Sequence, residues 1–345
     1  MTDSKPAGDD RAEPQIVLSV IIATYNARSL LADCLRSIAQ NPPKESYEVV
    51  VVDDASKDDT SEMVRTSFPE VRLLRNEVNQ HYAFSNNRAF ECARGEYLLL
   101  LNNDTIVLPD ALDRMVAFLR EHPDAGAVGC KLLNEDGSIQ WSVKSLPNPG
   151  SALFGARSII TRLFPNNPFS RHHLQHLSCD MINPFVAGYV SSAAVLIPRH
   201  VIDKVGGLDR RLSYHVDADY CKRIENLGYK SYYLPTATII HLDHKGGTMV
   251  SVRRRFRSIV EFHRGSYIYY QKHIQTSVWS PMHLVVVLGL FARFVVSIVA
   301  RICAELIRIA RQPASQAAGR SDRERRGGPA GLQARTQTAD RAADR

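Results

Sequence analysis

The sequence predicts an α/β fold built on a mostly parallel sheet with helices on both faces. Between residues 16 and about 135, short apolar runs rich in Val, Ile and Leu alternate with stretches whose apolar residues have helical spacing. The apolar runs are nearly continuous, which is typical of strands buried on both faces of a parallel sheet. A long apolar stretch near the C-terminus, interrupted by arginines, predicts a further amphipathic helix.

The first half of the chain contains four predicted strand–helix pairs, and Gly95 is the predicted end of the third helix. Because crossovers between parallel strands are right-handed, the carboxyl ends of these strands meet along one edge of the sheet. The predicted strands are 16–26, 47–56, 71–76 and 96–105, and the predicted helices are 29–40, 57–68, 84–95 and 109–122.

The pattern is less regular in the second half. Residues 137–185 are rich in Pro, Asn and His and predict no clear element. A strand and a helix return at 190–209, a helix and a strand follow at 217–235, and a short strand is expected within 237–248. We expect a smaller α+β portion built onto the first sheet.

Bulk composition favours a globular protein with reduced cysteines and an anionic partner. The chain has 345 residues, 44% of them hydrophobic, and a formal net charge of +7. Its 6 cysteines are scattered singly, without a C-x-x-C pair. Residues 1–15 contain no apolar stretch of the kind a signal peptide needs, and both they and the basic tail at 312–345 are predicted to be disordered.

The stretch 283–310 predicts a helix that lies in a membrane interface. Arg293 interrupts it, so neither uncharged run reaches the roughly 20 residues of a spanning helix. One narrow stripe collects the polar and cationic side chains, and the rest of the helix is Leu, Val, Ile and Phe. The alternative is a helix that packs on the domain or on a second copy of the chain. The stripe is formed by His283, Arg293, Ser297, Arg301, Glu305, Arg308 and Arg311.

Three carboxylates, Asp53, Asp54 and Asp104, follow predicted strands. Sheets of this kind bind ligands at the carboxyl ends of their strands. Neither G-x-x-x-x-G-K-[ST] nor G-x-G-x-x-G follows the first strand, which disfavours a P-loop or a dinucleotide site. Carboxylates at strand ends instead predict a bound Mg²⁺ or Mn²⁺, with diphosphate oxygens completing its coordination.

Five motifs occur in an order that resembles the family-two glycosyltransferases of the GT-A fold. They are "VIIATYNA", "VVVDDASKDDT", "NNRAFECARGEYLLLLNNDT", "VGGLD", and "DADYCKR" followed by "GY". The resemblance covers about residues 16–275, and within the family the chain looks most like rhamnosyltransferase-type enzymes of bacterial surface polysaccharides. It implies an inverting, metal-dependent transferase that uses a nucleotide-diphosphate sugar.

The resemblance assigns nucleotide-binding roles to the ends of the first two strands. A carboxylate at Asp54 can accept a hydrogen bond from N3–H of uracil or thymine, whereas cytosine lacks that proton. The alternative is that Asp54 and Ser56 only cap the next helix. The residues implied are Thr24, Tyr25 and Asn26 after the first strand, Asp53 and Asp54 after the second, and Asn86, Asn87 and Arg88 in the following segment.

The metal-binding D-x-D motif of the family corresponds to Asn102-Asn103-Asp104. Because Asn replaces the first Asp, Asp104 is expected to make the metal contact nearly alone, with Asn103 beside it in the donor pocket. The alternative for Asp104 is a turn that caps the next helix. His241 ends a later strand, where the family often places a His near the diphosphate or the metal. A polar surface position explains His241 equally well.

The catalytic base of inverting members is an Asp in a Glu-Asp-x-Asp-like segment at a helix N-terminus. In "HVDADYCKR" this implies Asp217, with Asp219 in reserve, although Val216 replaces the usual Glu. The base must be ionised and within hydrogen-bond reach of the acceptor hydroxyl, and a helix cap is the alternative. The basic run at 253–257 fits a diphosphate, acidic lipid head groups or a solvated helix face.

We therefore expect a cytoplasmic glycosyltransferase attached peripherally to the inner face of the cell membrane. It would move a sugar, with rhamnose a candidate, from a dTDP- or UDP-sugar to a lipid-linked saccharide, and no nucleic-acid-binding motif accompanies its charge. A sugar nucleotidyltransferase and a non-catalytic membrane scaffold are the rival hypotheses. The expected parts are a disordered 1–15, a transferase domain at 16–275 (donor half 16–135, acceptor half 136–275), a membrane helix at 279–311 and a tail at 312–345.

Overall fold

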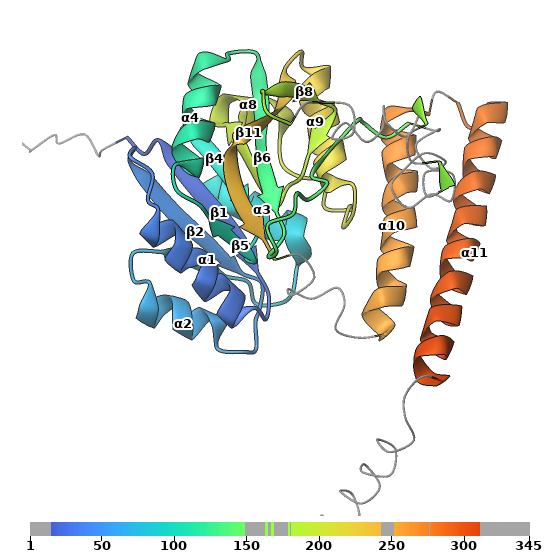
Figure 1. The fold of residues 1–345 in the computed structure, drawn as a ribbon, viewed down its shortest axis with the longest axis horizontal. Coiled ribbons are helices and arrows are strands. Elements are labelled where there is room, and N and C mark those ends of the chain that lie inside the picture. The colour runs from blue at the N-terminus through green and yellow to red at the C-terminus, as the bar shows by residue number, and fades with distance from the viewer. Residues whose placement is uncertain are drawn as a thin grey trace, which may run out of the picture. The chain divides into compact units, whose positions relative to one another are not determined.

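The computed structural model describes residues 15–148, 163–164, 167–168, 179, 181–242, 252–275 and 277–310. These residues form a mixed α/β structure followed by two long helices (Figure 1). The chain divides into two compact units, Met1–Phe294 and Val295–Arg345, so the boundary falls inside the last helix. The predictions for the two termini and for most of residues 149–180 fall outside the described residues.

The first half alternates strand and helix, as predicted. The strands are buried along most of their length because both faces of the sheet are covered. Helix α1 buries Leu31, Leu35 and Ile38, which share one face at helical spacing. The elements are β1 Leu18–Thr24, α1 Arg28–Gln40, β2 Tyr47–Asp53, α2 Thr60–Ser67, β3 Arg72–Arg75, α3 His81–Cys92, β4 Tyr97–Leu101, β5 Thr105–Val107, α4 Ala111–Glu121 and β6 Ala125–Leu133.

The second half adds short strands, two helices on the sheet and two long helices. Helix α8 follows β10 directly, and β11 follows α9 after Gly228, whose φ of 84° ends that helix. The elements are β7 Val143–Lys144, β8 Phe185–Ala187, β9 Tyr189–Val190, β10 Ala194–Pro198, α8 Arg199–Val205, α9 Val216–Asn226, β11 Lys230–His241, α10 Val252–His273 and α11 Pro281–Ala310.

Within the described residues, nine strands form one sheet in the order β3-β2-β1-β4-β10-β6-β11-β5, with β8 paired to β11. Strands β1 to β4 pair parallel with one another, which confirms the predicted parallel core. Strand β10 runs antiparallel between β4 and β6, and β5 runs antiparallel on the end of β11. The ends of β1, β2 and β3 are in register, because Thr24 and Arg75 both pair with Asp53.

Two apolar layers cover the sheet (Figure 1). One layer packs side chains of α1, α2 and α4 against the sheet, and the other uses α3, α8 and α9. The mean energetic gain from burying one such Leu or Ile side chain is about 1.5–3 kcal/mol, so these layers fix the sheet edge firmly. The loops at the carboxyl ends of β1, β2 and β4 are therefore held in one place relative to each other.

Candidate active site

The ends of β1 and β4 are joined directly by a side-chain hydrogen bond. Asn103 Nδ2 donates to Thr24 Oγ1 at 2.8 Å. Asn26, with a φ of 49°, links the two loops after β1 and β2, because its N–H donates to Ser56 Oγ at 2.9 Å and its Oδ1 accepts the Lys57 N–H at 2.7 Å. Tyr25 is half-buried between them. The structure thus brings together the residues predicted after the first strand and Asn103 of the metal motif.

Asp53 is enclosed in the turn after β2. Its side chain has no exposed surface, Oδ1 accepts the Ser56 N–H at 2.9 Å, and Oδ2 accepts the hydroxyl of Ser61. The Arg75 guanidinium lies 4.0 Å from Oδ2. Asp53 therefore holds the turn and the start of α2, and its assignment to nucleotide binding stays a prediction.

Asp54 holds the start of α3. Oδ1 accepts from Asn76 Nδ2 at 2.7 Å and from the Gln80 N–H at 2.8 Å, and Oδ2 accepts the His81 N–H at 2.8 Å. A carboxylate has about four lone-pair sites, so these three bonds leave room for one further donor. Sequence reasoning missed Asn76, although it follows β3 just as Asp54 follows β2.

The three residues of α3 that the sequence assigned to the donor site form hydrogen bonds with other groups of the protein. Asn87 exchanges two hydrogen bonds with Leu208, donating to its carbonyl at 2.9 Å and accepting its N–H at 2.7 Å. Arg88 Nη1 donates to the carbonyl of Arg75 and to Asn76 Oδ1, both at 2.7 Å. Asn86 is buried and donates to the Tyr82 carbonyl at 2.9 Å. Asn87 and Arg88 thus position neighbouring loops, a role that the sequence did not indicate, whereas Asn86 bonds within α3.

Asp104 and His241 lie side by side because β5 pairs antiparallel with the end of β11. Thr105 is the ladder partner of His241, and the Leu242 N–H donates to the Asp104 carbonyl at 2.9 Å. Asp104 Oδ1 is 3.3 Å from His241 Nε2, and Asn102 Nδ2 is 3.4 Å from the same nitrogen. Two residues predicted separately from distant motifs thus form one pair at the sheet edge.

The donor atoms of this pair fit the expected cation. A carboxylate oxygen suits both Mg²⁺ and Mn²⁺, and an imidazole nitrogen beside it suits Mn²⁺. Among the described residues, no group of three or more His, Cys, Asp or Glu side chains is placed to hold a metal ion. A cation at Asp104 and His241 would therefore take its remaining ligands from the diphosphate and from water.

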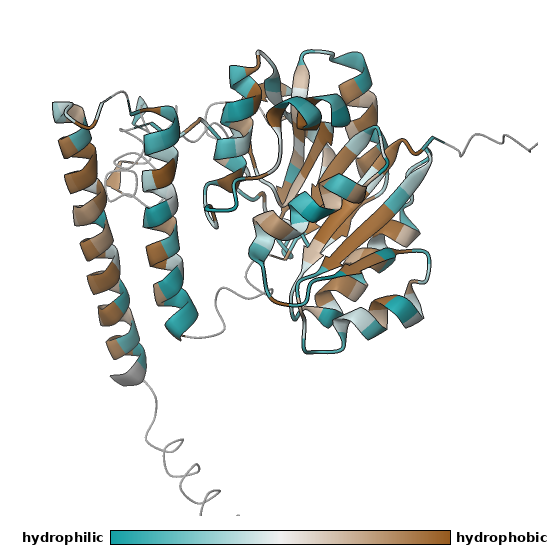
Figure 2. Ribbon diagram, turned by 180° about the vertical axis from the view of Figure 1, so that it is seen from behind, coloured by the Kyte–Doolittle hydropathy of each residue, from teal (hydrophilic) through white to brown (hydrophobic). Residues whose placement is uncertain are grey.

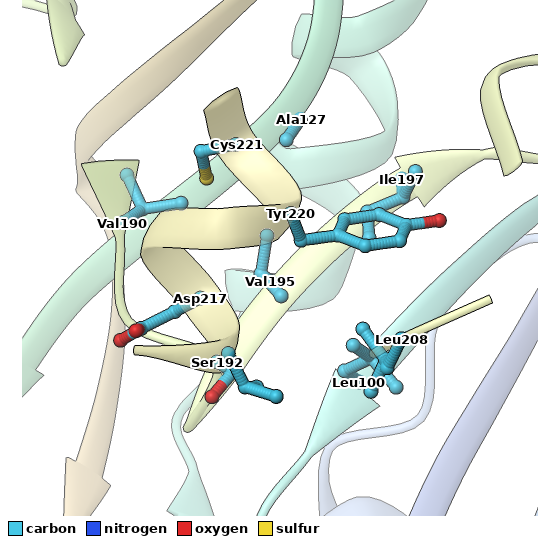
Figure 3. Close-up of a pocket in the computed structure, with 11 residues that line it drawn as sticks. Leu100, Ala127, Val190, Ser192, Val195, Ile197, Leu208, Asp217, Tyr220 and Cys221 are labelled. Atoms are coloured by element: carbon cyan, nitrogen blue, oxygen red, sulfur yellow. The ribbon is translucent and has the colours of Figure 1, made fainter. Parts of the chain in front are cut away.

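Asp217 lies at the start of α9 and lines a small pocket with mostly apolar walls (Figure 3). Its Oδ1 accepts the N–H of Ala218 at 2.9 Å. Burial raises the pKa of Asp217, and the nearby Lys144 ammonium opposes that rise. The pocket is also lined by Ser192, beside Asp217, and by Leu100, Val195 and Tyr220, among others.

The loop before β10 links Asp217 to the metal motif. Ala193 accepts the N–H of Asn102 at 2.9 Å, and its neighbour Ser192 lines the Asp217 pocket. Tyr82, on the first turn of α3, donates its hydroxyl to the Ser192 carbonyl at 3.2 Å. One short loop therefore contacts both the metal motif and the pocket lined by Asp217.

Asp219 has no exposed surface and three basic side chains around it. Oδ2 is 3.0 Å from Arg223 Nε, and Oδ1 is 2.7 Å from both Lys272 Nζ and His273 Nε2. Because Lys272 and His273 end α10, this cluster ties α10 to α9. These contacts favour a structural role for Asp219, and its use as a reserve base stays a prediction.

Solved structures with similar folds are glycosyltransferases. A mannosyltransferase from Pyrobaculum calidifontis, solved in complex with GDP-Man and Mn²⁺, matches with a TM-score of 0.52 at 20% identity, over 89% of this chain and 79% of that one. This likeness shows that the fold is the GT-A fold of nucleotide-sugar transferases, with the apolar helix α11 in addition.

The family model for glycosyl transferase family 2 matches residues 19–192, which is half of the chain. This chain belongs to the family-2 glycosyltransferases.

Two named relatives are bacterial glycosyltransferases. N-acetylglucosaminyl-diphospho-decaprenol L-rhamnosyltransferase of Mycobacterium tuberculosis is 26% identical over 265 residues, 73% of this chain and 83% of that protein. Poly(ribitol-phosphate) beta-glucosyltransferase of Bacillus spizizenii is 29% identical over 150 residues, 42% of this chain and 24% of that protein. The similarity to a rhamnosyltransferase agrees with the resemblance seen in the motifs.

Proposed function

We propose that this glycosyltransferase moves a sugar from a UDP- or dTDP-linked donor to a hydroxyl of a lipid-linked saccharide in cell-envelope glycan synthesis, with inversion at the anomeric carbon. The observation that carries the proposal is the Asp104–His241 pair, 3.3 Å apart at the sheet edge of a family-2 chain. The lipid-linked acceptor is supported by the relative whose printed name includes a diphospho-decaprenol saccharide.

Asp104 and His241 would hold the Mg²⁺ or Mn²⁺ of the donor complex. When bound, such a cation neutralises the charge that develops on the leaving diphosphate. Next to Asp104 in the chain, Asn103 is held to Thr24 at the end of β1 by a 2.8 Å hydrogen bond. Asp54 would accept N3–H of uracil or thymine with its remaining lone pair, which selects against a cytosine nucleotide.

Asp217 would act as the general base on the acceptor. It takes the proton of the acceptor hydroxyl as that oxygen attacks the anomeric carbon, and the bond from that carbon to the diphosphate oxygen breaks. The electron pair of that bond leaves with the nucleotide diphosphate, and single displacement inverts the configuration. The pKa of Asp217, raised by burial, moves the carboxylate closer to the basicity that proton abstraction needs.

The apolar, exposed helix α11 supports the proposal that the acceptor lies in a membrane. Residues Pro281–Arg308 are long and apolar enough to cross a bilayer, and their most apolar window is not buried. In the first unit, Arg293 lies over the Phe262 ring of α10 at 4.9 Å and His283 stacks on Tyr270. These two residues of the polar stripe thus contact α10, while side chains on the apolar side are exposed, and Figure 2 shows α11 mostly in the hydrophobic colour. The exposed side chains include Met282, Leu284, Val285, Leu288 and Phe291.

A position of α11 in the membrane interface explains the structure better than a path across the bilayer. His283, at the start of α11, contacts α10 of the transferase unit, so that end stays on the same side as the catalytic domain. A crossing would carry Arg301, Arg308 and the arginine-rich tail to the opposite side, against the positive-inside rule. We therefore place the enzyme on the inner face of the cytoplasmic membrane, with the exposed side of α11 in the lipid interface.

A vesicle assay tests this attachment. The double variant Leu288→Asp, Phe291→Asp should lose most of its sedimentation with anionic phospholipid vesicles, because both side chains are exposed on the apolar face. Val78→Asp is the matched control, since Val78 is equally exposed but belongs to a loop of the sheet domain. Equal sedimentation of all three proteins would contradict the proposal and favour packing on a second copy.

A donor panel tests the reaction. Purified protein is incubated with Mg²⁺ or Mn²⁺, UDP-, dTDP- and GDP-sugars and a membrane lipid extract, and nucleotide diphosphate release is measured. We expect release from one UDP- or dTDP-sugar that depends on the extract and stops with EDTA. No release from any donor would contradict the enzyme proposal and favour a non-catalytic scaffold.

A further inference from the structure

Gln140 contacts Nδ1 of the His241 ring, whereas Nε2 of that ring faces Asp104. It follows a turn in which Gly137, with a φ of 81°, reverses the chain, and Ile139 then pairs back with Leu133. The Gln140 N–H donates to the Leu132 carbonyl at 2.8 Å. Since Ile240 pairs with Leu133 on the other side, this turn brings the Gln140 side chain to the end of β11.

The orientation of the Gln140 amide is fixed by two acceptors. Its Nε2 donates to the His241 carbonyl at 2.6 Å and to Asn134 Oδ1 at 2.8 Å. Asn134 is itself fixed, because its Nδ2 donates to Ser138 Oγ at 2.8 Å. A flipped Gln140 amide would place its oxygen against two other oxygens. The amide oxygen must therefore face His241 Nδ1, from which it lies 2.9 Å away.

We propose that Gln140 is a positioning residue that holds His241 as the Nδ1–H tautomer and aims Nε2 at the cation site beside Asp104. Gln140 Oε1 can only accept, so Nδ1 carries a proton whether the ring is neutral or charged. In the neutral ring the lone pair is then on Nε2, 3.3 Å from Asp104 Oδ1. Partners of this kind set the ring orientation and basicity of metal-binding histidines. The inference rests on the proposed cation site.

The competing tautomer would remove the ligand. With a proton on Nε2, His241 would have no lone pair for the cation and would instead donate to Asp104 Oδ1, taking one of the lone-pair sites of that carboxylate. The remaining donor near Nε2 is Asn102 Nδ2 at 3.4 Å, which favours a lone pair at that nitrogen. Gln140 therefore keeps His241 available as a ligand of a site in which the described residues provide no third His, Cys, Asp or Glu ligand.

Two variants separate positioning from folding. Gln140→Leu keeps the size and removes the acceptor, and Ile139→Ala is the control in the same turn. The Ile139 side chain is 44% exposed and apolar, so it takes no part in the hydrogen bonds that fix Gln140. Each variant is first compared with wild type by thermal unfolding.

The readouts are the His241 tautomer and the affinity for Mn²⁺. Long-range ¹H–¹⁵N spectra of ¹⁵N-histidine-labelled, metal-free protein report the tautomer, with His241→Gln assigning the signal. Electron paramagnetic resonance titration with MnCl₂, with and without UDP, reports affinity. We expect Nδ1–H in wild type and Ile139→Ala, and an Nε2–H signal with about 10–100-fold weaker Mn²⁺ binding in Gln140→Leu.

Two results would overturn the inference. One is an Nε2–H tautomer in the wild-type protein, which decides the question even if Gln140→Leu fails to fold. The other is Mn²⁺ binding in folded Gln140→Leu within twofold of wild type. Neither readout requires sugar transfer, so a protein that binds Mn²⁺ as expected but releases no nucleotide would refute the proposed function alone.

Discussion

Asp219→Asn is expected to destabilise the fold strongly while leaving the chemistry of sugar transfer intact. Asp219 is wholly enclosed, with Arg223, Lys272 and His273 at 3.0, 2.7 and 2.7 Å. Removing one partner of a buried ion pair typically costs about 3–5 kcal/mol. Here Lys272 keeps Asp209 at 3.1 Å, and Arg223 keeps the carbonyls of Val205 and Gly207 at 2.9 Å. These remaining partners place the loss at the lower end, about 3 kcal/mol.

Urea and thermal unfolding in detergent measure this loss. A change of about 3 kcal/mol corresponds to a fall in Tm of roughly 6–10 °C for a unit of this size. The control is Glu225→Gln on the same helix, whose ion pair with Lys222 is exposed and should contribute less than about 1 kcal/mol. A change below about 1 kcal/mol for Asp219→Asn, or a lost acid limb in its pH–rate profile below the unfolding temperature, would refute the structural role.

Three further variants test other parts of the structure. Asp217→Asn should raise Tm at pH 8 but hardly at all near pH 4: burial raises the pKa of Asp217, so the folded chain binds this proton more tightly than the unfolded chain, and the cost of ionisation grows from the unfolded pKa upward and is complete above the folded pKa; an equal gain at both pH values would contradict this. Asn87→Ala leaves both backbone groups of Leu208 without their partner and should lower the free energy of unfolding by about 1–3 kcal/mol in urea titrations, where no change would show that the bonds are dispensable. Gly265→Val should weaken sugar transfer and lower Tm, because a Cβ at residue 265 would lie 2.7 Å from the Tyr214 carbonyl, next to the turn that carries Asp217; wild-type activity would show that this close packing is unimportant.

The parallel core was predictable because its signal is local. Four apolar runs of β-branched residues, each followed by a helical stretch, determine β1 to β4 and place their ends at one edge. The short strand β5 has three residues, Thr105–Val107, and nothing in the sequence indicates that it pairs with the distant β11. The motifs assign Asp104 and His241 to the same metal, but only this long-range pairing shows how the two residues come into contact.

The roles of individual residues were harder to predict than their positions in the fold. Asp53 and Asp54 are adjacent acids after one strand, yet one is enclosed by a turn and the other holds the start of α3, because successive side chains point in different directions. Asn87 and Arg88 lie beside the site but bind backbone carbonyls of neighbouring loops. Gln140 lies close to a segment without periodicity, and its importance follows only from three hydrogen-bond partners that the fold brings together.

The most direct test of the account is to compare nucleotide binding with sugar transfer in Asp217→Asn. The active donor from the panel is used with Mn²⁺ and lipid-linked acceptor, and nucleoside diphosphate binding is measured by calorimetry on the same preparation. We predict that binding stays within about twofold of wild type while the transfer rate falls by at least the roughly 10²-fold that general base catalysis provides. Transfer at the wild-type rate by Asp217→Asn would contradict the central claim that this carboxylate deprotonates the acceptor.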